Sequence, residues 1–97
     1  MYGTLARYRV KRGMLRKLRE FEAEIGSAGT KGLVAEFTLS TDVDADICYK
    51  LAIFESKEAY DAVADDPEQD RRYHRLLELL DGPPEWHDGE IIHAKRA

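Results

Sequence analysis

The apolar residues of this chain alternate in some stretches and recur at helical spacing in others, and the order of these stretches limits what the chain can fold into. Strict alternation in residues 2–10, 33–40 and 47–54 predicts three half-buried strands. Residues 14–25 carry apolar side chains at helical spacing, which predicts an amphipathic helix. Gly26 supplies the stop signal for that helix.

The remaining segments complete the order of elements. Residues 26–32 are rich in glycine and predict a loop. Ser56 is a suitable N-cap for a short helix. The Asp-Pro pair at residues 66–67 is a stronger start signal, and it precedes a leucine-rich helix. A last strand is expected within residues 85–94, interrupted near residues 88–89.

The resulting order, β-α-β-β-α-β, predicts a single α+β domain that spans residues 1–97. Right-handed crossovers place the first and third strands side by side in the centre of a four-stranded antiparallel sheet, with the helices on one face. This is a ferredoxin-like arrangement. Because many unrelated activities use it, the fold alone does not define a function.

Composition narrows the class of protein. The chain is 43% hydrophobic and 35% charged, which is typical of a soluble domain with one core. No apolar run approaches the roughly 18 residues of a membrane span, and the first residues lack the apolar stretch of a signal peptide. Cys48 is the only cysteine, so an intramolecular disulfide is excluded. We therefore expect a cytoplasmic protein that does not bind membranes.

Charge is distributed unevenly along the chain. Residues 1–31 contain eight basic and three acidic side chains, whereas residues 32–97 contain seven basic and sixteen acidic ones. Attraction between the two halves, within the fold or across a dimer, explains this asymmetry, and a cationic patch for an anionic ligand is the alternative. The net charge of −4 disfavours nucleic acid as a partner.

Residues 54–60 read Phe-Glu-Ser-Lys-Glu-Ala-Tyr, and an Asp-Pro pair and a leucine-rich helix follow them. This pattern resembles the antibiotic-biosynthesis-monooxygenase-like proteins of the dimeric α/β-barrel superfamily, in which an aromatic residue at the end of the third strand leads into F-x-S-x-E-A. The Val-Lys-Arg-Gly turn at residues 10–13 matches the V-x-x-G of the same family. The resemblance covers nearly the whole chain by pattern, but fewer than about ten residues carry it.

The resemblance implies a homodimer whose two sheets face each other, with a pocket between each sheet and its own helices. It also implies oxygenation of a small electron-rich aromatic compound without a cofactor. Haem-degrading members of the family use an Asn, a Trp and a His. This chain has no Asn, and its only tryptophan, Trp86, lies beyond the second helical segment. His74 is near the expected position of the His but stands alone, which argues against that branch.

The candidate binding residues are aromatic, since aromatic rings line cavities and phenols can hydrogen-bond a quinone or phenol. They are Tyr8, Tyr60, Tyr73 and Trp86. The candidate catalytic bases are His74 and His87. The alternatives are that the aromatic residues belong to an ordinary core and that His74 pairs on the surface with acidic residues one helical turn away.

Other site chemistries fail on spacing or on missing residues. The three histidines do not form a metal-ligand pattern on one helix. The Asp-rich turn at residues 42–46 imitates the start of a calcium loop, but Ile47 and Ile53 stand where that loop needs Gly and Glu. The third predicted strand lacks the aromatic signature of an RNA-recognition motif. Acylphosphatase chemistry needs an Asn, which this chain lacks.

Two functions therefore remain open: a cofactor-independent monooxygenase and a small-molecule-binding protein that performs no reaction. Both would act as homodimers through the open face of the sheet, because a half-apolar sheet face exposed to water marks an interface. We assign to the helix-covered face Tyr8, Val10, Leu33, Phe37, Leu51 and Ile53. The open face then carries Leu5, Arg7, Arg9, Val34, Glu36, Thr38, Lys50, Ala52 and Phe54. On this assignment Phe54→Asp splits the dimer or unfolds it.

Overall fold

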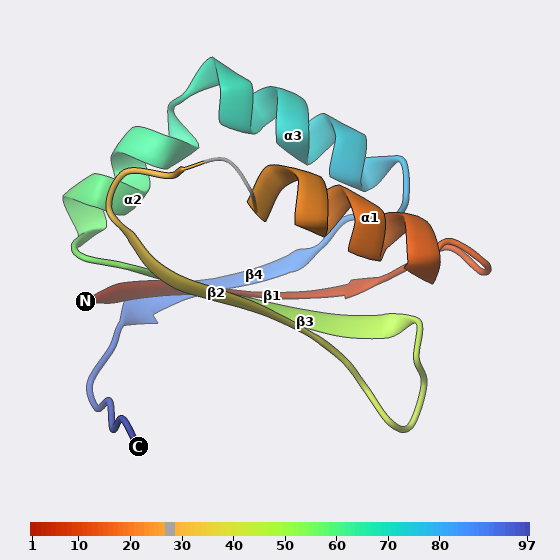
Figure 1. Cartoon of the computed structure of the whole chain (residues 1–97), viewed down its shortest axis with the longest axis horizontal. Helices are drawn as coiled ribbons and strands as arrows, with labels where there is room; N and C mark the ends of the chain where they lie inside the picture. Colours follow the sequence, from red (N-terminus) through yellow and green to blue (C-terminus); the bar gives the residue numbers. More distant parts are fainter. Residues whose placement is uncertain (27–28) are drawn as a thin grey trace.

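The computed structural model describes residues 1–26 and 29–97. The chain forms β1 (Tyr2–Arg9), α1 (Leu15–Gly26), β2 (Leu33–Ser40), β3 (Ile47–Phe54), α2 (Lys57–Ala64), α3 (Pro67–Leu77) and β4 (Glu85–Glu90). Figure 1 shows the three helices on one face of the sheet and the C-terminal segment leaving on the other side. The predicted loop at 26–32 includes Ser27 and Ala28, which lie outside the described residues.

The four strands form one antiparallel sheet in the order β2-β3-β1-β4, so β1 and β3 are central as predicted. This confirms the ferredoxin-like α+β fold. The predicted caps are also present: the Ser56 side chain accepts a hydrogen bond from Ala59 N, and the Asp66 side chain accepts one from Glu68 N. Each cap satisfies a backbone donor that the first helical turn leaves without a partner.

The core lies between α1, the end of α3 and the central strands. Alternate residues of β1 point toward the helices and are buried, and α1 packs Leu18 and Phe21 against them. Leu76 of α3 and Leu80, which bridges to Val10 just after β1, close the same cluster. No helix among the described residues has the length and apolar character needed to cross a membrane.

The predicted face of β1 is confirmed, whereas those of β3 and of β2 from Ala35 onward are wrong. Leu33 lies under the helices as predicted, because it pairs with Phe54 before the irregularity in β2. Residues directly opposite each other in a ladder share a face, and Thr4 pairs with Ala52 while Ala52 pairs with Glu36. The even-numbered residues of β3 therefore face the helices. Phe54 is 5% exposed, whereas Phe37 on the other face is 63% exposed.

The reversal moves a whole set of charged and polar residues under the helices. The helix-covered face carries Glu36, Thr38, Lys50, Ala52 and Phe54, and the open face carries Phe37, Leu39, Leu51 and Ile53. The charged members are tolerated there because they pair with one another, as buried charges must. Because Phe54 is not on the open face, Phe54→Asp no longer tests a dimer.

The interruption expected near residues 88–89 is absent, because β4 pairs with β1 without a break. Gly89 lies opposite Gly3, and Asp88 lies opposite Thr4. At Gly3 an added Cβ would lie 2.8 Å from Ile91 Cδ1. Because Gly3 has no side chain, Ile91, which follows β4, can fill the space beside it.

Candidate functional site

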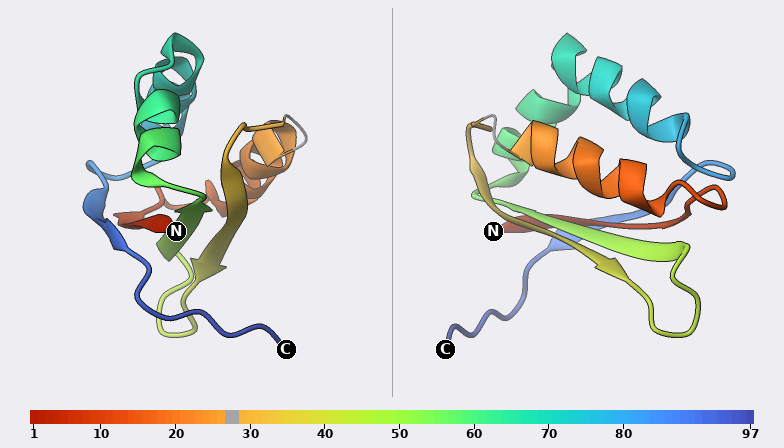
Figure 2. Two further views of the ribbon diagram at one scale, coloured as in Figure 1. Left: turned by 90° about the vertical axis from the view of Figure 1, so that its left-hand side faces the viewer. Right: turned by 45° about the vertical axis from the view of Figure 1, so that its right-hand side comes forward.

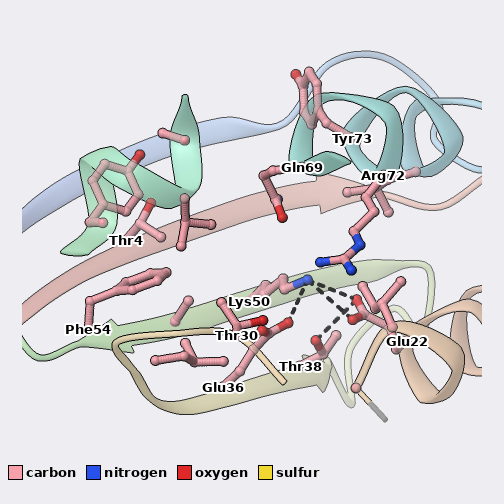
Figure 3. A pocket seen from close by; sticks show the side chains of 18 of the residues that line it. Thr4, Glu22, Thr30, Glu36, Thr38, Lys50, Phe54, Gln69, Arg72 and Tyr73 are labelled. Atoms are coloured by element: carbon pink, nitrogen blue, oxygen red, sulfur yellow. Dashed lines mark hydrogen bonds and ion pairs between the residues drawn. The ribbon is translucent and has the colours of Figure 1, made fainter. Parts of the chain in front are cut away.

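A cavity of about 990 Å³ lies between the sheet and the helices. In Figure 2, α1 and the α2–α3 segment stand apart above the same face of the sheet. Side chains from these helices and from the sheet line the cavity. Residues from all four strands and all three helices line the cavity, and Figure 3 shows the side chains of most of them. Cavities of this size, between a sheet and its helices, hold small organic ligands.

One end of the cavity carries a hydrogen-bonded set of three residues, Thr4, Tyr60 and Asp88, which we call the Asp88 group. Thr4 Oγ1 donates to Asp88 Oδ1 at 2.5 Å, and Tyr60 OH donates to Asp88 Oδ2 at 3.2 Å. Burial, and then the charge of Asp88, raise the pKa of Tyr60. The phenol therefore stays protonated and remains a donor at neutral pH.

Aromatic rings form much of the wall beside the Asp88 group. Phe54 and Tyr60 meet edge to face with centroids 5.4 Å apart. Tyr73 and Trp86 lie on the cavity with centroids 6.1 Å apart. Such rings favour a flat apolar ligand, because they bury large areas and stack in defined geometries.

The other end of the cavity carries three charged side chains, Glu22, Glu36 and Lys50, which we call the Lys50 group. Lys50 Nζ lies 3.2 Å from Glu22 Oε2 and 2.7 Å from Glu36 Oε1 (Figure 3). Burial by itself would lower the pKa of Lys50, but the charges of Glu22 and Glu36 outweigh it and raise the pKa. Lys50 is therefore a permanent cation and cannot serve as a base.

Helix α3 also contributes side chains to the lining of the cavity. Gln69, Arg72, Tyr73 and Leu76 lie three and four residues apart, so they share the face that points into the cavity. The Arg72 side chain is 24% exposed, and its Nε lies 4.0 Å from Glu68 Oε1.

The structure brings three of the predicted binding residues together: Tyr60, Tyr73 and Trp86 all line the cavity. Tyr8 does not line it. Its ring is 2% exposed within the core, and its hydroxyl has no hydrogen-bond partner among the described residues. Burial, and then the charge of Glu22, raise the pKa of this hydroxyl well above its usual range.

The two predicted bases lie elsewhere. His74 is on the outer side of α3, where its Nδ1 donates to the Asp70 carbonyl oxygen at 2.8 Å. His87 is on β4, between Trp86 and Asp88, and so points to the opposite face of the sheet, where its Nε2 lies 2.9 Å from Glu85 Oε1. Neither imidazole lines the cavity. The acidic residues that line the cavity include Asp88, which receives hydrogen bonds from Thr4 and Tyr60.

Sequence reasoning missed the polar residues of the cavity, among them Thr4, Glu22, Glu36, Lys50 and Asp88. One signal was available: Thr4 shares the alternation of Ala6 and Tyr8, which places it on the buried face of β1. The others read as surface residues because charge usually indicates solvent. Within the described ranges, no set of three or more His, Cys, Asp or Glu side chains is arranged to hold a metal ion.

The chain is thus a ferredoxin-like α+β domain with a cavity between its sheet and its helices. No protein-family model matches the chain, and no curated protein sequence matches it. Solved structures do match in fold. A variant of SnoaB, a cofactor-independent oxygenase from Streptomyces nogalater, superimposes with a TM-score of 0.83 at 15% identity, over 96% of this chain and 94% of SnoaB.

Two further structures support the same fold. A protein from Chloroflexus aurantiacus, provisionally named an antibiotic biosynthesis monooxygenase, gives a TM-score of 0.80 at 18% identity, over 98% of this chain and 96% of its own. NE2512 of Nitrosomonas europaea, a protein of unknown function, gives a TM-score of 0.80 at 19% identity, over 99% of this chain and 93% of its own. The chain therefore has the antibiotic-biosynthesis-monooxygenase-like fold, as the resemblance at residues 54–60 predicted.

Proposed function

We propose that this protein is a cofactor-independent monooxygenase that acts on a small electron-rich aromatic compound. The observation that carries the proposal is the Asp88 group, a carboxylate held by two hydroxyl donors at the end of an aromatic-walled cavity. A substrate that reacts with oxygen in the form of a carbanion needs a base to remove its proton. It also needs a hydrogen-bond donor that positions it and a cavity that excludes water. SnoaB, which shares the fold, is a cofactor-independent oxygenase.

The proposed reaction converts an activated CH2 group and O2 into a carbonyl group and water. Asp88 takes a proton from the carbon, and the carbanion gives one electron to O2. The two radicals then combine, forming a C–O bond in a peroxide. Asp88 returns its proton to the outer oxygen, the carbon loses its second proton as the O–O bond breaks, and water leaves. The carbon loses four electrons and O2 gains four, so no other reductant is required. Tyr60 holds Asp88 in place and is 3.2 Å from it.

We expect oxygen-dependent turnover of at least one compound in a panel of anthrones and hydroquinones. The measurement is product formation in air and under nitrogen, with oxygen uptake recorded in parallel. Rates equal to those of buffer across the whole panel would reject the enzymatic proposal. A compound that raises the melting temperature but is recovered unchanged would instead identify a binding protein, since ligand binding alone stabilises the folded state.

We infer in addition that the protein functions as a homodimer through the open face of the sheet. Leu5, Phe37 and Leu39 are 38%, 63% and 59% exposed on that face. Leu51 and Ile53 lie beside them, opposite Phe37 and Ala35 in the β2–β3 ladder. A second copy facing this surface would bury it from water and close the structure by a two-fold axis.

Light scattering is expected to give a mass of about twice 11.1 kDa. Phe37→Asp should reduce that mass to one chain, because it places an unpaired charge among the exposed apolar residues of the open face. Val43→Asp is the matched control, since Val43 is 98% exposed in the β2–β3 turn and should leave the mass unchanged. A monomeric wild-type protein at micromolar concentration would contradict the inferred dimer.

A further inference from the structure

Arg72 reaches the cavity from α3 without a carboxylate bound to it. Its side chain is 24% exposed, and the nearest carboxylate oxygen among the described residues is Glu68 Oε1, 4.0 Å from its Nε. This distance is too long for a hydrogen bond. Glu68 is instead held by Arg71, whose Nε and Nη2 donate to Glu68 Oε2 at 3.1 and 2.5 Å. The guanidinium of Arg72 therefore keeps its N–H donors available to the cavity that it lines.

Two neighbouring cations differ from Arg72 in this respect. Lys50 Nζ lies 2.7 Å from Glu36 Oε1, and Arg75 Nη2 lies 2.7 Å from Glu24 Oε2. Buried polar groups in proteins are nearly always hydrogen-bonded, and a guanidinium has five N–H groups to satisfy. A largely covered guanidinium that forms no hydrogen bond within the described part of the chain is therefore a place where a ligand can supply the acceptor.

The end of the cavity near Arg72 is balanced in charge. Figure 3 shows the Arg72 side chain pointing from α3 into the cavity, toward Lys50 and Glu22. The Lys50 group carries one negative charge in total, because one ammonium faces two glutamates, and the guanidinium of Arg72 offsets that charge. An uncharged acceptor, such as a ketone oxygen, can therefore approach the N–H groups of Arg72 without breaking an ion pair.

The proposed reaction creates negative charge on the substrate. When Asp88 takes a proton from the CH2 group, the C–H bond breaks and its electron pair stays on the substrate. A carbonyl group conjugated with that carbon accepts the pair, so the charge resides on the carbonyl oxygen. Before the transfer the charge is on Asp88, which has two hydroxyl donors and no cationic partner in residues 1–26 and 29–97. Donors already in place where the charge develops stabilise the transition state.

We propose that Arg72 donates hydrogen bonds to this carbonyl oxygen and thereby stabilises the carbanion as an enolate. Asp88 and Arg72 both line the cavity of about 990 Å³, which has room for a flat ring system that contacts both. The substrate is then an aryl ketone whose carbonyl group is conjugated with the reacting CH2 group. The inference rests on the proposed function for the reaction, whereas binding of an aromatic oxyanion by Arg72 can be measured without turnover.

The probe is 2-naphthol, because its deprotonated form places an oxyanion on a flat aromatic ring and absorbs at longer wavelength than the neutral form. Titration at several pH values under nitrogen gives the affinity of each form. We expect the wild type to bind naphtholate at least about tenfold more tightly than naphthol, since a cation within about 4–6 Å favours the charged form by this amount. Arg72→Gln should abolish this preference.

Arg16→Gln is the control, because it makes the same change in net charge on an exposed part of α1, where Arg16 pairs with Glu20. It should leave the preference for naphtholate unchanged. Arg72→Lys keeps the charge but loses the planar fork, so a preference several-fold smaller than that of the wild type is expected. This variant also serves as the test if Arg72→Gln does not fold. An unchanged preference in the folded Arg72 variants, an equal loss in Arg16→Gln, or failure of the wild type to bind either form would overturn the inference.

Kinetics supply the second readout. With the best anthrone of the panel, Arg72→Gln should lower kcat about 100-fold and change KM little, because one donor to an oxyanion contributes about 10²–10³ to kcat. A wild-type kcat in this variant would overturn the inference and leave the proposed function intact. No turnover by the wild type, together with a naphtholate preference that depends on Arg72, would reject the proposed function and retain Arg72 as the residue that binds an aromatic oxyanion.

Discussion

Asp88→Asn is expected to lower kcat by about 100-fold or more, since general base catalysis by a positioned side chain contributes about 10²–10⁴. Asparagine has nearly the same shape and can still accept a hydrogen bond from Thr4 or Tyr60, the two donors to Asp88. It cannot accept the substrate proton. Oxygen uptake with the best compound of the panel measures kcat, and titration under nitrogen measures whether binding survives.

The control for this variant is Glu58→Gln, which also converts an acid to an amide and lies on the exposed side of α2. It should leave both kcat and KM unchanged. Tyr60→Phe removes one donor to Asp88 but keeps the ring, so a smaller loss than that of Asp88→Asn is expected. An Asp88→Asn variant that retained most of the wild-type kcat would exclude Asp88 as the base.

The order of elements could be predicted because its signals are local. Ser56 and Asp66 cap their helices as the sequence indicates, and alternation in β1 places Tyr8 and Val10 inside. In β1 the two faces differ clearly, since arginines occupy the exposed positions 7 and 9. The pattern and the burial therefore agree.

The faces of β2 and β3 could not be predicted by the same rule, because both faces of these strands carry apolar residues. Hydrophobicity alone then places Phe37 inside and Lys50 outside, whereas the structure has the reverse. The rule that charge indicates solvent fails here because Lys50 meets Glu22 from α1, a partner 28 residues away in the sequence. Such a pair becomes visible only after α1 has been placed over the sheet.

The need to know the tertiary structure also explains why the sequence indicated histidines, and not Asp88, as candidate bases. A histidine attracts attention in a sequence because its pKa suits proton transfer near neutral pH. Asp88 became a candidate only when the β1–β4 register placed it opposite Thr4 and the crossover brought Tyr60 above it. His87, one residue earlier on β4, points to the other side of the sheet because side chains alternate. A shift of one residue in register would exchange their roles.

Lys50→Met is expected to destabilise the folded chain by about 3 kcal/mol at neutral pH, because removal of one partner leaves buried charges without compensation. Methionine keeps much of the volume of the lysine stem, so the loss reports charge more than packing. Glu22 and Glu36 would remain close together, with side chains 18% and 32% exposed. Urea unfolding of both proteins measures the difference in free energy.

The dependence of this loss on pH identifies its cause. In the wild type the folded-state pKa of Lys50 is raised above its ordinary value, so its contribution is present throughout the neutral range and is lost only as the pH rises through that folded-state pKa. In the variant, Glu22 and Glu36 lie close together without a cation between them, and a proton bound by either one relieves their mutual repulsion. The deficit relative to wild type should therefore shrink toward about pH 5.

Two further variants separate the ion pairs of the cavity from ordinary surface pairs. Lys57→Met breaks the exposed pair with Asp61 on α2 and should leave the stability close to that of the wild type. Adding Glu22→Gln and Glu36→Gln to Lys50→Met should recover part of the lost free energy, because no uncompensated charge then remains. A Lys50→Met protein as stable as the wild type, or a deficit that does not change with pH, would show that the Lys50 group does not hold α1 to the sheet.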